Sequence, residues 1–227
     1  MTPEFSILHA TIRLPDGWRA AYQAWKDACD HWSRVEYVLC IDEQDIENHR
    51  QVLLNAPEDV RVVINHGRHC SVDAFNAAAE ASTGDFLIQS ADDWFPCPHW
   101  DTEIRKLIPD MSKEAVIDVD NGHFTGHIII CPMLTRAYYE RPGRGACGGK
   151  LFYPEYMSMG ADDDFTMVAK RDGVVINAYH LFFDHQHPWR GNVAHDTHGA
   201  YAHNQSHAAW HAKDTILPRR IAEDFQR

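Results

Sequence analysis

Several features that define particular protein classes are missing from this chain of 227 residues. It has no apolar run near the roughly 20 residues that a membrane-spanning helix needs, and residues 1–6 carry no signal-peptide pattern. No Cys-x-x-Cys pair occurs, so in a chain of this size the cysteines indicate reduced, mostly buried thiols. The six cysteines are Cys29, Cys40, Cys70, Cys97, Cys131 and Cys147. We expect a cytoplasmic protein with no transmembrane segment.

Positive charge is also scarce. The 21 Lys and Arg residues face 33 Asp and Glu residues, which gives a formal net charge of −12 at pH 7. Proteins whose affinity comes from coating a nucleic-acid backbone need a basic surface. The excess of acidic residues argues against a protein that coats a nucleic-acid backbone, although it leaves room for one local basic groove. The only small basic clusters, residues 141–144 and 218–220, are typical of solvated loops.

Strand-like and helix-like segments alternate through the first half of the chain. An apolar face from Trp18 to Trp32 predicts a helix capped by Asp16, and Ser71 is expected to cap an Ala-rich helix over residues 72–82. This alternation predicts an α/β fold, with a mainly parallel central sheet and helices on both faces. The loops after the first, second and fourth strands then share one ligand-binding edge. The expected strands are residues 5–9, 35–41, 60–64 and 85–90.

The pattern loosens beyond Asp110, and no linker or repeat divides the chain. We predict one domain over residues 1–188, with residues 189–227 as a histidine-rich helical appendage of the same domain. The expected elements of this half are strands at 114–118, 127–131 and 174–183, a Gly-rich loop at 141–160 and a helix at 165–171.

The most informative motif lies at the carboxyl end of the fourth strand. The segment Asp85-Phe-Leu-Ile-Gln-Ser90 runs directly into Ala91-Asp92-Asp93-Trp94-Phe-Pro96. Two adjacent carboxylates at a ligand-binding edge are costly unless they meet a cation or share a proton. Oxygen ligands suit Mg²⁺ or Mn²⁺, and such ions usually hold a substrate phosphate as well. We favour metal binding over a turn in which the acids only cap the backbone.

The order of these features resembles the A-type glycosyltransferase fold, closest to the inverting glycosyltransferase family 2. The resemblance covers residues 4 to about 188 and depends on the order and spacing of motifs that are each weak alone. One departure is Ser90, which stands where the family usually has the first acid of its metal motif. The matching segments are Ser6 to Arg13, Asp42, Asn65 to Asn76, Ser90 to Asp93, Ala161 to Asp164, and His185 with His187.

The resemblance implies a role for each matching residue. Asp163, with Asp162 in reserve, is expected to be the general base that takes the proton of an acceptor hydroxyl. A Mn²⁺ or Mg²⁺ ion is expected on Asp92, Asp93, His185 and His187. Because alternate residues of a strand point to opposite faces, His185 is favoured over His187. A nucleotide-sugar donor, expected to be a UDP-sugar, would contact Thr11, Arg13, Asp42, Arg68, Asn76 and Asp92.

The chemistry of sugar transfer fits two separate acidic groups. A divalent ion stabilises the diphosphate that leaves, and a carboxylate on the other side of the anomeric carbon takes the proton of the attacking hydroxyl. The acids at 162–164 have a second explanation, because carboxylates are also favoured at a helix N-terminus by the helix dipole.

Other functions stay open at this point. The acceptor can be a saccharide, a lipid-linked molecule, or hydroxymethylated DNA, as for some phage glycosyltransferases. His203, His207 and His211 share one helical face, which is typical either of a solvated surface or of a non-enzymatic zinc-binding module. A pyrophosphorylase-like nucleotidyltransferase is disfavoured, because residues 10–17 lack a Gly-rich, basic phosphate cradle.

Overall fold

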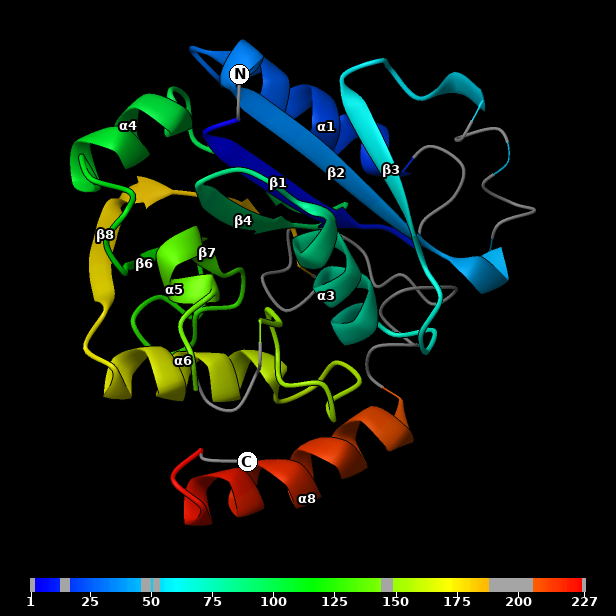
Figure 1. Cartoon of the computed structure of the whole chain (residues 1–227), viewed down its shortest axis with the longest axis vertical. Helices are drawn as coiled ribbons and strands as arrows, with labels where there is room; N and C mark the ends of the chain where they lie inside the picture. Colours follow the sequence, from blue (N-terminus) through cyan, green and yellow to red (C-terminus); the bar gives the residue numbers. More distant parts are fainter. Residues whose placement is uncertain are drawn as a thin grey trace.

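A seven-stranded sheet forms the centre of the structure, a computed structural model that describes residues 3–12, 17–45, 50, 54–143, 149–187 and 206–225. Only β7 runs against the other strands, because it pairs antiparallel with both of its neighbours, β4 and β6. The prediction of a mainly parallel sheet is confirmed (Figure 1). In spatial order the strands are β3 (Val60–Asn65), β2 (Val35–Asp42), β1 (Phe5–Ala10), β4 (Phe86–Ser90), β7 (Met133–Thr135), β6 (Val116–Asp120) and β8 (Val175–Phe182).

Helices cover both faces of this sheet (Figure 1). On one face, helices α1 (Gly17–Asp27) and α4 (Trp100–Leu107) bury Trp25 and Trp100 against Ile7 of β1. On the other face, helices α3 (Ser71–Ala81) and α6 (Ala161–Arg171) pack against Leu8. Successive residues of a strand point to opposite faces, so a strand buried on both sides is apolar throughout. This explains the unbroken apolar runs in the sequence.

The C-terminal helix α8 (His207–Ala222) lies beside α6, and α5 (Arg136–Tyr139) follows β7 (Figure 1). A helical C-terminal segment was expected and is present. Ser206 caps α8 by accepting a hydrogen bond from the main-chain N–H of Ala209 at 3.3 Å. The rings of His207 and His211 stack at 6.4 Å, whereas His203 lies outside the described residues.

Three local predictions are wrong. Residues 127–131 form no strand, because the N–H groups of His127 and Ile128 donate to the carbonyl of Phe124 and close a turn. Burial of Ile129, rather than strand pairing, accounts for the apolar run there. Helix α1 ends at Asp27, and Trp32 packs on the core from the separate 3-10 helix Trp32–Arg34. The third error concerns the start of α3.

The N-cap position of α3 belongs to Cys70 and not to Ser71. The hydroxyl of Ser71 donates instead to the carbonyl of Met157 at 3.3 Å, which ties the helix to a distant loop. Tertiary contact has overridden the local capping preference of serine. Asp16, the predicted cap of α1, lies outside the described residues.

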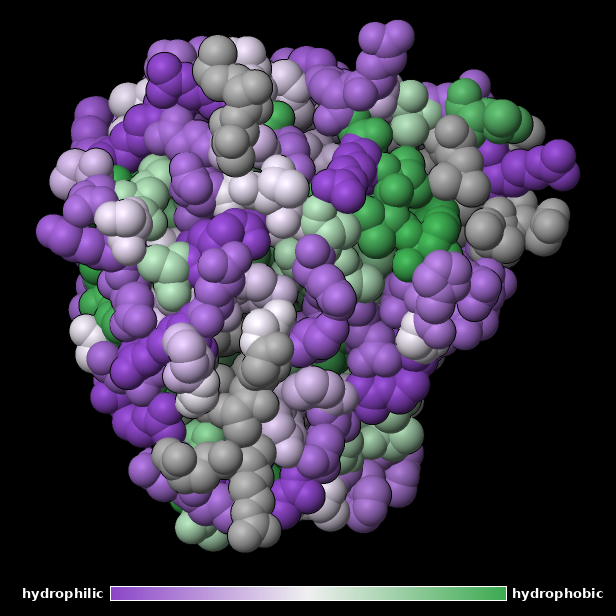
Figure 2. Space-filling view, viewed as in Figure 1, coloured by the Kyte–Doolittle hydropathy of each residue, from purple (hydrophilic) through white to green (hydrophobic). Residues whose placement is uncertain are grey.

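The molecular surface in this view is mostly hydrophilic, with one apolar area on the side where the edge strand β3 lies (Figure 2). Within the ranges that the structure describes, no helix combines the length and apolar character required to cross a bilayer.

Candidate active site

The acidic motif after β4 is joined to the end of β1. These two strands are parallel neighbours, and their register brings the motif beside His9 and Thr11. Oδ1 of Asp92 lies 2.8 Å from Nε2 of the fully buried His9, and Oδ2 accepts the Thr11 hydroxyl at 3.0 Å. The other His9 nitrogen contacts the Tyr37 hydroxyl. Burial, with the charge of Asp92, raises the pKa of Tyr37 well above its usual value. Tyr37 is therefore neutral, and its hydroxyl and the Asp92 carboxylate hold the two ring nitrogens of His9.

His9 was not predicted as a site residue. The available signal was a histidine near the end of a mostly apolar strand, at the ligand edge. Asp92 and Thr11, both predicted, do meet in the structure. Arg13 lies outside the described residues.

A second, two-stranded sheet brings the late histidines to the acidic motif. Strand β5 (Trp94–Phe95) pairs antiparallel with β9 (Asp184–His185), and the N–H of Gln186 donates to the carbonyl of Asp93 at 2.8 Å. As a result, Nε2 of His185 lies 3.9 Å from Oδ1 of Asp93. The predicted meeting of Asp93 with a late histidine is present in the structure.

Three imidazole rings lie together beside Asp93. The ring centres of His185 and His187 are 5.1 Å apart, and those of His123 lie 5.3 Å from His185 and 5.6 Å from His187. His123 was missed by sequence reasoning. Its signal was position: it follows β6, which runs in the same direction as β4 and so ends at the same edge.

Asp42 also lies at this edge, at the end of β2 and directly opposite Asn65 of β3. Its Oδ1 accepts the Asn65 side-chain N–H at 2.6 Å, and its Oδ2 lies 3.2 Å from Nε2 of His69. The same His69 nitrogen lies 3.0 Å from Asp45. The predicted acid is thus a buried carboxylate in a polar cluster, on the far side of β1 from Asp92.

Two other residues that were predicted to contact the nucleotide sugar form hydrogen bonds within the protein. Arg68 pairs with Asp73 at 2.6 Å and donates to main-chain carbonyls at residues 154–156. The Asn76 side chain exchanges hydrogen bonds with the main chain of Phe152, at 3.1 and 2.9 Å. Both side chains hold the end of the Gly-rich loop against α3. A direct role for them in donor binding stays a prediction.

The three consecutive acids that open α6 have different surroundings. Oδ2 of Asp164 pairs with Nε of Arg220 at 2.8 Å, and both side chains are buried. Oδ2 of Asp163 pairs with Nζ of Lys213 at 2.8 Å. Burial raises the pKa of the Asp162 carboxyl to about 6, and the nearby Asp163 carboxylate adds to the rise. Asp162 is therefore a carboxyl whose protonation changes near pH 6.

The loop before β7 contacts α6 and also lies near the acidic motif. Burial, with the charges of Asp93 and Asp162, raises the pKa of the Cys131 thiol well above its usual value. The negative charges of both carboxylates therefore disfavour the thiolate form of this buried cysteine. The Thr166 hydroxyl of α6 accepts the N–H of Ile129 at 2.9 Å and donates to the Asp162 carbonyl at 2.7 Å. These bonds fix the loop against the first turn of α6.

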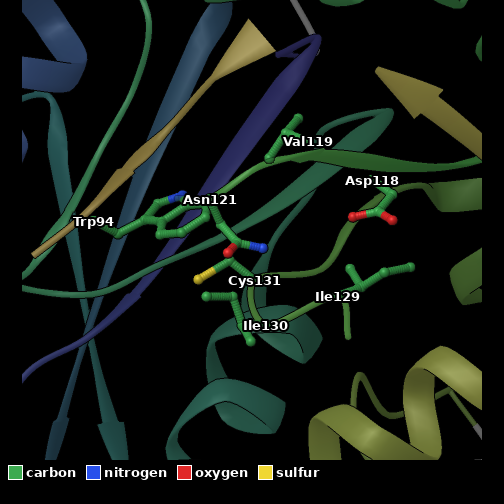
Figure 3. A pocket seen from close by; sticks show the side chains of 7 residues that line it. All are labelled: Trp94, Asp118, Val119, Asn121, Ile129, Ile130 and Cys131. Carbon is green, nitrogen blue, oxygen red and sulfur yellow. The ribbon is translucent and has the colours of Figure 1, made fainter. Parts of the chain in front are cut away.

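A shallow recess without room for an enclosed water molecule lies along this loop. Trp94, Asn121 and Cys131 gather on one side of it, and Asp118 and Ile129 lie farther along (Figure 3). Burial raises the pKa of Asp118, which accepts a hydrogen bond from the Tyr179 hydroxyl at 2.9 Å. The recess is too small for a nucleotide sugar.

Two groups of possible metal ligands in the described part of the chain have donor atoms within 4.8 Å of one another. One is the cluster of Asp42, Asp45 and His69. The other is Asp30, His31 and Asp101, where the buried Asp101 accepts the main-chain N–H groups of Asp30 and His31 at 2.8 and 3.1 Å. That second group lies at the start of α4 and closes a turn.

No protein-family model and no curated protein matches the sequence. Solved structures do match. S. aureus TarS superposes with a TM-score of 0.59 at 14% identity, over 79% of this chain and 36% of that chain. TarS 1–349 in complex with UDP-GlcNAc gives 0.59 at 13% identity, over 81% and 59%. Mannosyltransferase PcManGT from Pyrobaculum calidifontis, in complex with GDP-Man and Mn²⁺, gives 0.60 at 16% identity, over 85% and 59%.

The chain therefore spans between 36% and 59% of the length of these matched chains. At this level of identity the likeness establishes the fold. The chain has the A-type glycosyltransferase fold that the order of its motifs predicted.

Proposed function

We propose that this chain is an enzyme that transfers a sugar from a nucleoside-diphosphate sugar to an acceptor hydroxyl, with inversion. One observation carries the proposal: Asp93 lies at the ligand edge with Nε2 of His185 at 3.9 Å, and a second set of carboxylates, which includes Asp162, lies in the first turn of α6. Sugar transfer needs two such groups, one for the leaving diphosphate and one for the incoming hydroxyl. The fold supports this assignment, since the matched structures hold UDP-GlcNAc or GDP-Man.

Asp42 and Asp92 are proposed to bind the donor. Both are largely buried carboxylates at the ligand edge, one on each side of β1. The Asp42 cluster suits the N–H groups of a nucleobase, because a carboxylate only accepts hydrogen bonds. A UDP-sugar is the first donor to test. Asp92 already accepts two hydrogen bonds and has lone pairs left for the ribose or a metal ion.

Asp93 is proposed as the main carboxylate ligand of a Mn²⁺ or Mg²⁺ ion, together with His185 and His187. Carboxylate and imidazole beside one another form a donor set that suits such an ion. A bound divalent ion supplies charge that stabilises the diphosphate as it leaves. The protein's own part is orientation: the β5–β9 pairing holds Asp93 and His185 in register before any ligand arrives.

Asp162 is proposed as the general base. A base works best when its pKa lies near the operating pH, and the pKa of Asp162 is raised to about 6. Asp163, the residue first favoured, is paired with Lys213, and Asp164 is buried against Arg220. We therefore place Asp162 before Asp163 as the group that takes the acceptor proton. Asp163 stays the alternative.

The acceptor can be a saccharide, a lipid-linked molecule or modified DNA. The net charge of −12 favours an acceptor other than DNA, because DNA binding depends on phosphate contacts. Binding of an oligonucleotide that weakens steeply with salt would instead support the DNA acceptor.

The first experiment is a screen of UDP-, GDP-, CDP- and dTDP-sugars with Mn²⁺, by thermal stabilisation and donor hydrolysis. A ligand that binds only the native state raises the melting temperature. We expect one nucleotide class to stabilise the wild type and to lose this effect with Asp42→Asn. If no donor stabilises or is hydrolysed, the proposed function is wrong.

A further inference from the structure

The three-histidine cluster beside Asp93 contains one residue that the sequence motifs did not indicate. His185 and His187 come from the segment that pairs with β5, whereas His123 comes from the loop after β6. All three rings are at least partly buried. Their presence at the diphosphate end of the proposed site requires an explanation, because three neighbouring imidazoles give the core little that apolar side chains would not give.

The loop that carries His123 is fixed by its own hydrogen bonds. Oδ1 of Asn121 accepts the N–H groups of His123 and Phe124, at 3.1 and 2.7 Å. Oδ1 of Asp120 accepts the Thr125 hydroxyl at 2.7 Å. The His123 ring packs on Phe124 with centres 4.3 Å apart. Ligand residues held by such supporting bonds are preorganised for binding.

The spacing of the rings matches that of imidazoles on one ion. With metal–nitrogen bonds of about 2.0–2.1 Å and tetrahedral angles, two imidazole ring centres lie about 5 Å apart. The observed separations are 5.1, 5.3 and 5.6 Å. The ligand atoms of the cluster are not yet close enough to share one ion. Among the described residues, the three histidines do not form a group whose ligand atoms all lie within 4.8 Å of one another. Ring rotation is needed, because His123 and His185 are nearly parallel at 15°.

We propose that His123 is a third imidazole ligand of the divalent ion at Asp93, His185 and His187, and that this site takes Mn²⁺, Co²⁺ or Zn²⁺ in preference to Mg²⁺. The inference rests on the metal role proposed above and adds a ligand and a metal class to it. Imidazole suits first-row transition ions. Mg²⁺ prefers oxygen ligands in an octahedron and keeps several waters. A carboxylate with three imidazoles therefore selects against Mg²⁺.

The test uses the metal alone, without nucleotide or acceptor. Chelator-treated wild type is titrated calorimetrically with MnCl₂, ZnCl₂ and MgCl₂, and the visible spectrum of bound Co²⁺ reports its ligands. We expect Mn²⁺ and Zn²⁺ to bind at least about 10-fold more tightly than Mg²⁺. Equal or tighter binding of Mg²⁺ would overturn the proposal. A failure of sugar transfer would leave these titrations unchanged, so the two proposals fail separately.

Three substitutions locate the ion. His123→Phe keeps an aromatic ring against Phe124 but removes both nitrogens, and it should weaken Mn²⁺ binding at least about 10-fold and alter the Co²⁺ spectrum. His185→Phe should do the same. The matched control is His211→Phe, which removes an imidazole from the stacked pair on α8 and should change neither.

Two results contradict the assignment of His123. In one, His123→Phe binds Mn²⁺ like the wild type while His185→Phe does not, which makes His123 a packing residue. In the other, His211→Phe abolishes binding, which places the ion on α8. Metal-free melting curves check that each variant folds. Should His123→Phe melt early, His123→Gln replaces it in the same titrations.

Discussion

The Nζ atom of Lys213, on the C-terminal helix, lies 2.8 Å from Oδ2 of Asp163, at the start of α6. Two helical turns farther along α8, Arg220 pairs with Asp164 at 2.8 Å. The C-terminal helix thus neutralises two of three consecutive acids. For the third acid, Asp162, burial is the main cause that raises the pKa of its carboxyl to about 6.

Asp162→Asn should lower turnover by about 100-fold, the usual scale for loss of a general base. Donor affinity should stay close to that of the wild type, because Asp162 is not part of the donor cluster at Asp42 and Asp92. Steady-state kinetics and a donor titration measure the two effects. Asp163→Asn is the matched variant, and it should have the smaller effect on turnover. A larger loss with Asp163→Asn would return the role of base to that residue.

Turnover should fall at acid pH, because a base must be deprotonated. With the pKa of Asp162 raised to about 6, kcat should drop about 10-fold per pH unit below that value. The charge of Lys213 lowers the pKa of Asp162. Lys213→Met should therefore move the acid limb of the kcat profile to higher pH, with KM for the donor unchanged. The control is Lys106→Met, whose partner is Glu103 on α4. An unmoved limb in Lys213→Met would show that the titrating group is not Asp162.

Removing the Asp162 charge should also stabilise the fold near neutral pH. The folded pKa of about 6 lies above the ordinary value of 3.8, so the folded state binds more protons between these values. The contribution of this carboxyl to stability is therefore complete below pH 3.8 and is lost as pH rises through 6. We expect Asp162→Asn to melt at a higher temperature than the wild type at pH 7.5, and not at pH 4. Equal melting temperatures at pH 7.5 would mean that the carboxyl is well solvated.

The buried ion pair between Arg220 and Asp164 should matter for stability. Arg220→Met leaves a carboxylate buried without its cation, and such changes cost about 3–5 kcal/mol. Denaturant unfolding measures the cost. The neighbouring Arg219→Met removes an exposed pair with Glu155, and it should change the unfolding free energy far less. If both variants unfold alike, α8 is not anchored through the Asp164 pair.

The sequence predicted the sheet and its ligand edge because strand and helix periodicity is local information. Five predicted site residues lie at the expected edge for the same reason, since each follows or ends a strand. They are Thr11, Asp42, Asp92, Asp93 and His185. Partners distant in the chain were not predictable in this way. The bond from His9 to Asp92 spans 83 residues, and the pairing of Lys213 with Asp163 spans 50.

The choice between Asp162 and Asp163 illustrates this limit. Their identical chemistry gave the sequence no means to tell them apart. Only the placement of α8 gives Asp163 a cation. Likewise, the strand expected at residues 127–131 had suitable apolar residues, but the turn at Phe124 took two of its N–H donors.

The most direct test of the account is a calorimetric titration of UDP in the presence of Mn²⁺ with three proteins. The account predicts that the wild type and Asp162→Asn bind UDP alike, whereas the double variant Asp92→Ala, Asp93→Ala loses metal-dependent binding. Retention of full metal-dependent binding by the double variant would contradict it, because the acidic motif would then have no part in holding the diphosphate.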